Sequence, residues 1–193
     1  MVKLTKIYTR GGDKGKTSLG DGKRVHKDDL RVAAYGAVNE ANAAIGVARL
    51  HLTGNADDML GRVQDDLFDL GADLCVPEDG KKSAHTGNAA LRIVATQVER
   101  LETEIDYMNE SLEPLNSFIL PGGTPGAAHL HLVCTVVRRA ERLMVRLTRT
   151  KGEVVNEYTL QYINRLSDHI FVLARHVNDK DDPDILWRPG ANR

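Results

Sequence analysis

Apolar residues recur at three- and four-residue spacing through five long segments of this chain, and this periodicity limits its fold more than any other feature. In the first segment the repeating positions are Ala34, Val38, Ala41, Ile45 and Ala48. Such spacing places the residues on one face of an α-helix, and that face must be buried against another element. Five such segments joined by short connections predict an all-α protein, a five-helix antiparallel bundle.

The breaks between the periodic segments set the expected helix bounds. We predict helices over residues 30–51, 57–74, 89–109, 125–150 and 153–178. Leu91 and Val94 are expected on the buried face of the third helix. On the second helix, the acidic residues opposite the apolar stripe are expected to be solvated, with pairing to arginines elsewhere as the alternative. These residues are Asp65, Asp66, Asp69 and Asp73.

The length of 193 residues fits one domain with its own core, so we treat residues 1–193 as a single domain. The bundle takes residues 28–178, preceded by an N-terminal segment, residues 1–27, and followed by a C-terminal tail, residues 179–193. Aromatic residues make up only 5% of the chain, which favours helices over a sheet. In the tail, Trp187 is expected to rest on the body of the protein.

Charge and composition exclude several kinds of partner. The net charge of −1 argues against nucleic-acid binding, which normally needs a basic excess. No apolar run approaches the roughly 20 residues that span a bilayer, and the first residues lack the apolar segment of a secretory signal. Cys75 and Cys134 have no metal-type spacing, so we expect two buried free thiols. We therefore expect a cytoplasmic protein with neither a nucleic-acid nor a membrane partner.

Residues 7–24 form a glycine-rich segment that carries the chemistry of a phosphate site. Five glycines and five cations fall within it, together with the hydroxyls of Thr17 and Ser18. Glycines let successive backbone amides point toward one anion, and lysine and arginine supply the charge that a polyphosphate requires. The segment predicts a phosphate cradle, and a flexible glycine-rich tail is the alternative.

A P-loop is the first motif to compare with this segment, because Gly15, Lys16 and Thr17 match the end of Gly-x-x-x-x-Gly-Lys-Ser/Thr. The first glycine of that motif would stand at position 10, where this chain has Arg10. Residues 3–8 are also too polar for the buried strand that precedes a P-loop. The segment is therefore a phosphate-binding candidate of another kind.

The predicted fourth helix carries a run of arginines opposite its apolar stripe. Arg138 and Arg142 lie one turn apart and can converge on one anion. A solvated face is the ordinary alternative for such a run. A further alternative is a helical interaction module whose arginines bind an acidic partner.

Three motifs together resemble the PduO-type ATP:cob(I)alamin adenosyltransferases, also called corrinoid adenosyltransferases. The motifs lie in the order of that family and extend over nearly the whole chain. The first comprises residues 7–15, 27–29 and 35–40, the second residues 118–123 and 138–142, and the third residues 164–168.

The resemblance implies transfer of the 5′-deoxyadenosyl group of ATP to cob(I)alamin by direct attack of Co(I) on C5′, which yields adenosylcobalamin and triphosphate. It also implies a five-helix bundle of the ferritin-like type that assembles as a homotrimer with active sites between subunits. Mg²⁺ is expected to bind mainly through the ATP phosphates, with no protein ligand assigned, and a monovalent cation such as K⁺ to assist. The expected protein partners are a cobalamin reductase and an adenosylcobalamin-dependent enzyme.

The resemblance also implies roles for individual residues. Lys27 and Arg138 are expected to be catalytic, because they would stabilise the charge that develops on the leaving triphosphate. The expected ATP-binding residues are Thr9, Arg10, Gly11, Gly12, Thr17, Ser18, Lys27, Arg138, Arg139, Ala140, Glu141, Arg142 and Asn164.

The expected corrinoid-binding residues are Phe118, Asn39 and Cys134. By the resemblance, Phe118 belongs to an apolar wall that excludes the lower axial ligand of cobalt, and ordinary core packing is the alternative. Asn39 and Cys134 stand where the family usually has aspartate and arginine, which form a salt bridge between subunits. Replacing both charges together costs little, so we predict that the bridge is absent here. The glycine content further predicts that residues 7–27 are disordered without ATP.

Overall fold

The computed structural model describes residues 7–77, 89–178 and 184–193 of the chain. Two short strands, β1 (Lys16–Ser18) and β2 (Arg24–His26), pair antiparallel ahead of the first helix. The helices are α1 (Leu30–Arg49), α2 (Gly54–Cys75), α3 (Ala95–Asn109), α4 (Pro125–Thr148) and α5 (Glu157–His176). The predicted five-helix bundle is confirmed, and the hairpin of β1 and β2 is a feature that was not predicted.

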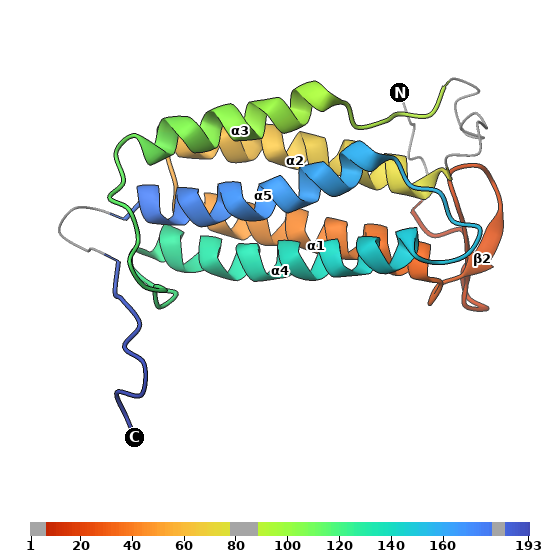
Figure 1. Ribbon diagram of the computed structural model, residues 1–193. Helices are drawn as coiled ribbons and strands as arrows, with labels where there is room; N and C mark the ends of the chain where they lie inside the picture. Colours follow the sequence, from red (N-terminus) through yellow and green to blue (C-terminus); the bar gives the residue numbers. More distant parts are fainter. Residues whose placement is uncertain (1–6, 78–88, 179–183) are drawn as a thin grey trace.

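The five helices lie side by side, with their ends gathered at two poles of the bundle (Figure 1). α1 packs against α2 and α4, α4 packs against α5, and α5 packs against α3. The hairpin lies at one pole, while the connection from α3 to α4 lies at the opposite pole together with the C-terminal tail (Figure 1). The apolar stripes meet in one continuous core, in which Leu60, Leu101 and Leu130 are fully buried.

α3 begins at Ala95, later than the predicted start at residue 89. Leu91 and Val94, which we expected on the buried face of this helix, are 53% and 49% exposed, so that prediction was wrong. Ile93 between them is buried, and its amide donates to a carboxylate oxygen of Asp73 at 2.8 Å. This tertiary hydrogen bond holds the segment outside the helix, which sequence periodicity could not show.

α5 begins at Glu157, so the predicted start at residue 153 was also wrong. The side chain of Asn156 accepts from the amide of Tyr158 at 3.1 Å and thereby caps the helix. Glu153 lies outside the helix, where its carboxylate accepts from the buried guanidinium of Arg31.

Two of the four acidic residues on the polar side of α2 are buried in the structure. Asp66 and Asp73 are only 6% and 2% exposed, so solvation was the wrong expectation for both. Asp66 pairs with Arg100 and accepts from the Tyr162 hydroxyl at 2.8 Å, while Asp73 pairs with Arg92. The alternative, pairing with arginines elsewhere in the chain, is confirmed for these two residues. Burial of an ionised carboxylate requires such partners.

The cysteines and the helices can be compared with what the composition predicted. Cys75 and Cys134 are both free thiols, as predicted; Cys134 is buried, whereas Cys75 is only half-buried. Within the described residues, no helix is long and apolar enough to cross a membrane.

Candidate active site

The glycine-rich segment forms a loop that folds back onto the hairpin. Thr17 pairs with Val25 and Ser18 with Arg24 across the two strands. The Arg24 guanidinium donates to Ser18 Oγ at 3.2 Å and to the carbonyl of Gly11 at 2.7 Å. Through Arg24, these contacts join β2 to the loop ahead of β1. The loop therefore has a defined path over the hairpin.

Lys27 lies where this loop meets the strand that leads into α1. Its backbone amide donates to the carbonyl of Gly15 at 2.9 Å. A Cβ added at Gly12 would lie 3.0 Å from Lys27 Nζ, so the lysine ammonium rests directly against the glycine backbone. The structure thus gathers the predicted N-terminal ATP residues at one pole of the bundle. They are Thr9, Arg10, Gly11, Gly12, Thr17, Ser18 and Lys27.

The second group of predicted ATP residues lies on the outer face of α4 and the adjoining face of α5. Arg138 and Arg142 are exposed, while Arg139 pairs with Glu40 of α1. Asn164 Nδ2 donates to Glu141 Oε1 at 2.8 Å.

Ala140 lies on the opposite side of α4. It is fully buried, so its side chain belongs to the core of the bundle.

A cavity of about 700 Å³ opens beside Arg138, between α4, α5 and the loop ahead of α4. Phe118 lines this cavity and is 78% exposed, which excludes core packing within this chain as its role. Its ring meets that of Trp187 edge-on, with the centroids 6.1 Å apart. The lining residues are Leu115, Asn116, Ser117, Phe118, Ile119, Pro121, His131, Cys134, Thr135, Arg138, Phe171 and Trp187.

The C-terminal tail is one wall of this cavity. The Trp187 amide donates to the Phe118 carbonyl at 2.7 Å, and Ser117 Oγ donates to the Trp187 carbonyl at 2.9 Å. Ile119 and Leu186 form an antiparallel bridge next to these bonds, and the Leu120 amide donates to the Ile185 carbonyl at 2.8 Å on its other side. Trp187 therefore rests on the loop that carries Phe118. The sequence showed only an apolar residue in a polar tail, with no pattern long enough to indicate this pairing.

Comparison with known proteins assigns this chain to a family. A family model described as cobalamin adenosyltransferase matches residues 7–177, which include both groups of predicted site residues. The chain belongs to the cobalamin adenosyltransferase family. The resemblance inferred from the three motifs is thereby confirmed.

Relatives and solved structures agree with this family. The corrinoid adenosyltransferase of Mycobacterium leprae is 46% identical over 195 residues, which cover 98% of this chain and 99% of that protein. A variant of the PduO-type ATP:corrinoid adenosyltransferase from Lactobacillus reuteri, solved with cobalamin and ATP, superposes with a TM-score of 0.85. It is 38% identical, over 95% of this chain and 97% of that one.

The wall of the cavity in this member of the cobalamin adenosyltransferase family is almost free of charge. Burial raises the pKa of the Cys134 thiol, which donates to the Ser167 carbonyl at 3.3 Å. Burial likewise lowers the pKa of His131, whose ring packs edge-on against Phe171. Both side chains are therefore neutral near pH 7. Among the lining residues, Arg138 carries the one permanent charge.

The predicted corrinoid residues do not come together within one chain. Phe118 and Cys134 share the cavity, but Asn39 lines a separate groove of about 440 Å³ with Tyr35 and Phe68. None of the residues that line the Phe118 cavity comes from residues 7–27. One chain therefore holds the two parts of the predicted site apart.

Proposed function

We propose that this protein transfers the 5′-deoxyadenosyl group of ATP to cob(I)alamin and releases triphosphate. The observation that carries the proposal is the largely apolar cavity with Phe118 in its wall and Arg138 as its one permanent charge. The same chain holds a glycine-rich loop against Lys27, and it belongs to the cobalamin adenosyltransferase family. A corrinoid fits an apolar cavity, and a triphosphate fits a cationic loop of backbone amides.

In the proposed reaction the electron pair of Co(I) forms the bond to C5′ of ATP. The bond between C5′ and the triphosphate oxygen breaks, and that oxygen leaves with the bonding pair. Negative charge therefore grows on the leaving group, where Lys27 and Arg138 stabilise it electrostatically. No side chain acts as a nucleophile, because the corrinoid supplies the reacting atom.

We propose Mg²⁺ as the counter-ion of the triphosphate, held mainly by phosphate oxygens, where it neutralises charge on the leaving group. Within the described residues, no group of three or more His, Cys, Asp or Glu side chains could hold a metal ion. The oxygens of ATP would therefore supply most of the ligands. A role for a monovalent cation such as K⁺ stays a prediction from the family resemblance.

The apolar wall of the cavity can exclude the lower axial ligand of cobalt. Phe118 is exposed into the cavity and is held there by Trp187. A phenyl ring at that place would occupy the space that a nitrogen ligand of cobalt needs. We propose that Phe118 keeps the lower ligand off cobalt, so that the Co(II) precursor can be reduced.

We propose that a homotrimer completes the site, with the N-terminal loop of one subunit closing on α4 of the next. The separation of the two groups of site residues supports this, as does Phe68 on α2, which is 69% exposed beside the Asn39 groove. An exposed apolar surface of this kind is typical of an interface. Asn39 and Cys134 would then meet without a salt bridge, since both are neutral.

The reaction implies partners on either side of it. A cobalamin reductase would supply Co(I), and an adenosylcobalamin-dependent enzyme would consume the product. ATP as the substrate and two free thiols support a cytoplasmic location.

The activity can be tested directly. Protein, ATP, Mg²⁺ and chemically reduced cobalamin are mixed, and the change in absorbance is followed as the cobalt–carbon bond forms. Wild-type protein should give adenosylcobalamin. Phosphate release without adenosylcobalamin would indicate an NTPase instead, and neither product would favour an interaction module.

Replacing Arg138 by alanine should lower the adenosylation rate about 100-fold, because one preformed electrostatic contact to the leaving group is lost. The protein should stay folded and oligomeric, since Arg138 is exposed. Arg146→Ala is the matched control, because Arg146 is exposed on the same helix and lies outside the proposed site. Equal losses in the two variants would contradict the role of Arg138.

A further inference from the structure

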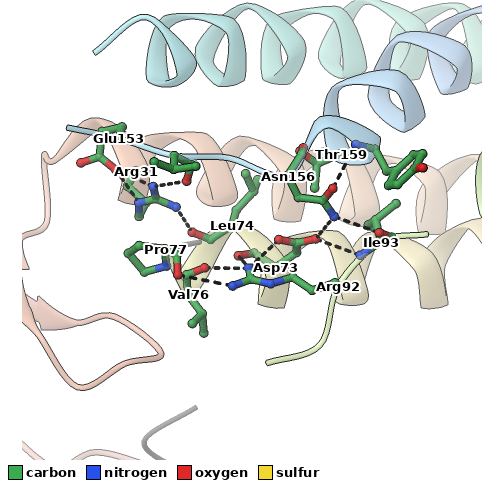
Figure 2. Close-up of polar contacts among 12 residues, drawn as sticks. Arg31, Asp73, Leu74, Val76, Pro77, Arg92, Ile93, Glu153, Asn156 and Thr159 are labelled. Atoms are coloured by element: carbon green, nitrogen blue, oxygen red, sulfur yellow. Dashed lines mark hydrogen bonds and ion pairs between the residues drawn. The ribbon is translucent and has the colours of Figure 1, made fainter. Parts of the chain in front are cut away.

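The C-terminal end of α2 is a junction at which three distant segments of the chain meet. The five consecutive carbonyls of residues 73–77 accept hydrogen bonds from segments outside the helix. Figure 2 shows those at Asp73, Leu74, Val76 and Pro77. Arg92 donates to the carbonyls of residues 73, 76 and 77, Arg31 to that of Leu74, and the amide of Gly20 to that of Cys75. The carbonyls of residues 73–75 belong to the last turn of α2, where a helix leaves its carbonyls without partners inside the helix.

Arg31 ties this junction to the loop between α4 and α5. Its guanidinium is 2% exposed and donates to the Leu74 carbonyl at 2.7 Å. It also donates to Glu153 Oε2 through Nε at 3.0 Å and to the Val154 carbonyl at 3.1 Å (Figure 2). One buried cation thus joins the first turn of α1, the end of α2 and the loop ahead of α5.

Asp73 organises the other half of the junction. Its carboxylate accepts from Arg92 at 2.7 Å, from the Ile93 amide at 2.8 Å and from Asn156 Nδ2 at 2.8 Å (Figure 2). Asn156 is also the N-cap of α5. This half fixes α5 and the segment ahead of α3, and among the described residues Asp73 makes no hydrogen bond to the hairpin.

The hairpin is attached at the Arg31 half. The Gly20 amide donates to the Cys75 carbonyl at 2.9 Å, next to the carbonyl that Arg31 binds. Leu19 is 3% exposed, so the turn of the hairpin is anchored in the protein. Arg31, Leu19 and Val25 together line a small cavity of about 160 Å³ between the hairpin and the helices.

Lys27 is placed between two points that this junction fixes. On one side, β2 ends at His26, whose carbonyl accepts from the Asp29 amide at 3.1 Å. On the other side, the Asp29 carboxylate caps α1 by accepting from the backbone amide of Arg31 at 2.9 Å. The backbone of Lys27 is therefore fixed by the hairpin and by the first turn of α1.

We propose that Arg31 is a positioning residue for ATP: it holds the hairpin and Lys27 in place by binding the C-terminal end of α2 and Glu153. This rests on the proposed function, since Lys27 and the loop at Gly12 are the proposed ATP site. Arg31 itself lies beneath the hairpin and acts through it. Without the guanidinium, the Leu74 carbonyl would be buried unpaired and Glu153 would lose its counter-charge. The turn at Gly20 would then rest on a loosened end of α2.

The test compares Arg31→Met with Arg49→Met. Arg49 is a matched control, because it also lies on α1 and also bonds to α2, through Asp57 at 2.6 Å and Gln64 at 2.7 Å. It stands about 27 Å further along the helix, at the opposite pole. Amide hydrogen exchange of residues 16–27 is measured without ATP, and the affinity for Mg–ATP is measured by calorimetry.

In Arg31→Met, we expect exchange of residues 16–27 to rise about tenfold and ATP affinity to fall about tenfold. Affinity for cob(II)alamin should change less than about twofold, because the cavity at Phe118 lies at the other pole. Arg49→Met should leave both hairpin exchange and ATP affinity unchanged. Unchanged hairpin exchange in Arg31→Met, or equal losses of affinity for ATP and corrinoid, would overturn the proposal.

A second variant covers a failure of Arg31→Met to fold. Arg31→Lys keeps the charge but lacks the planar fork that binds three partners, so it should show the same changes to a smaller degree. A wild-type level of both readouts in Arg31→Lys would overturn the proposal. If wild-type protein makes no adenosylcobalamin, the proposed function fails, whereas hydrogen exchange still decides whether Arg31 holds the hairpin.

Discussion

Gly20 shows how one position controls the approach of a loop to a helix. A Cβ built there would lie 2.5 Å from Val76 Cγ2, which is closer than two carbon atoms can pack. The glycine therefore lets the hairpin turn reach the end of α2. Periodicity does not reveal this, because the clash is with a residue more than fifty positions away.

Gly20→Ala should destabilise the protein by about 1–3 kcal/mol, the usual cost of overpacking. The measurement is urea unfolding followed by circular dichroism. Gly46→Ala is the control, since a Cβ there would have its nearest contact at 3.4 Å, with the end of the flexible Gln64 side chain. That control should be neutral or stabilising by up to about 1 kcal/mol. A neutral Gly20→Ala would show that the contact is not rigid.

Glu104 joins α2, α3 and α5 inside the bundle. Its carboxylate accepts from Arg62 at 2.8 Å and lies 2.8 Å from Nε2 of the fully buried His169. Burial acts to raise the pKa of Glu104, but the hydrogen bonds from His169 and Arg62 outweigh it, so the pKa lies below its usual value. The folded state thus favours the ionised carboxylate.

A carboxyl group with a lowered pKa contributes stability above its unfolded pKa of about 4.3, and this stability is lost as pH falls through the folded pKa. The free energy of unfolding should therefore fall more steeply below about pH 4.5 in wild type than in Glu104→Gln. Denaturant titrations between pH 7 and pH 3 would measure the difference. Parallel curves for the two proteins would mean that Glu104 has no part in acid unfolding.

At the scale of elements, the C-terminal tail takes part in the cavity only because it pairs with the loop that carries Phe118. Residues 185–187 pair with the loop that carries Phe118, and Arg175 Nε near the end of α5 donates to Asp184 at 2.7 Å. The same arginine donates to the Glu113 carbonyl at 2.8 Å. The Arg175 side chain therefore contacts both the tail and the connection ahead of α4.

Trp187→Ala should weaken cob(II)alamin binding about tenfold, because Phe118 loses its edge-on partner and the cavity loses one wall. ATP affinity should stay within about twofold, since the hairpin lies at the opposite pole. Spectroscopic titration with cob(II)alamin and calorimetry with ATP give the two values. A tryptophan that serves only stability would instead lower the unfolding midpoint and leave corrinoid affinity unchanged.

The order of the N-terminal segment can be measured by hydrogen exchange. Disorder of residues 7–27 without ATP stays a prediction. In the structure, residues 16–26 pair as a hairpin, whereas fewer contacts hold the loop of residues 9–15. We therefore expect the disorder mainly in this loop. Hydrogen exchange should therefore be slower in the hairpin than in the loop, and ATP should slow exchange most in the loop.

At the scale of the whole molecule, the proposed trimer can be tested by mixing two inactive variants. Lys27→Ala and Arg138→Ala are co-expressed so that subunits assemble at random. If each site takes its loop from one subunit and its arginine from the next, about a quarter of the sites are intact. Adenosylation should then return to about a quarter of the wild-type rate.

The control mixes wild type with the double variant Lys27→Ala, Arg138→Ala. Sites between subunits again predict about a quarter of the wild-type rate, whereas sites within one subunit predict about half. For sites within one subunit, the first mixture would have no activity. Sedimentation of each mixture checks that the oligomers are the same size.

The sequence by itself determined the helices and the family. Apolar spacing predicted five helices because helical periodicity is local, and it placed most bounds within a few residues. The motifs indicated a cobalamin adenosyltransferase because their residues and order are read directly from the chain. Arg138, Phe118 and Lys27 were named for the same reason.

The tertiary structure decided what depends on distant residues. Asp73 holds residues 92–93 out of the predicted third helix, and Arg31 holds Glu153 out of the predicted fifth. Trp187 becomes a wall of the Phe118 cavity only because the tail pairs with that loop. Each of these outcomes rests on hydrogen bonds or ion pairs between segments far apart in the chain, which no local pattern encodes.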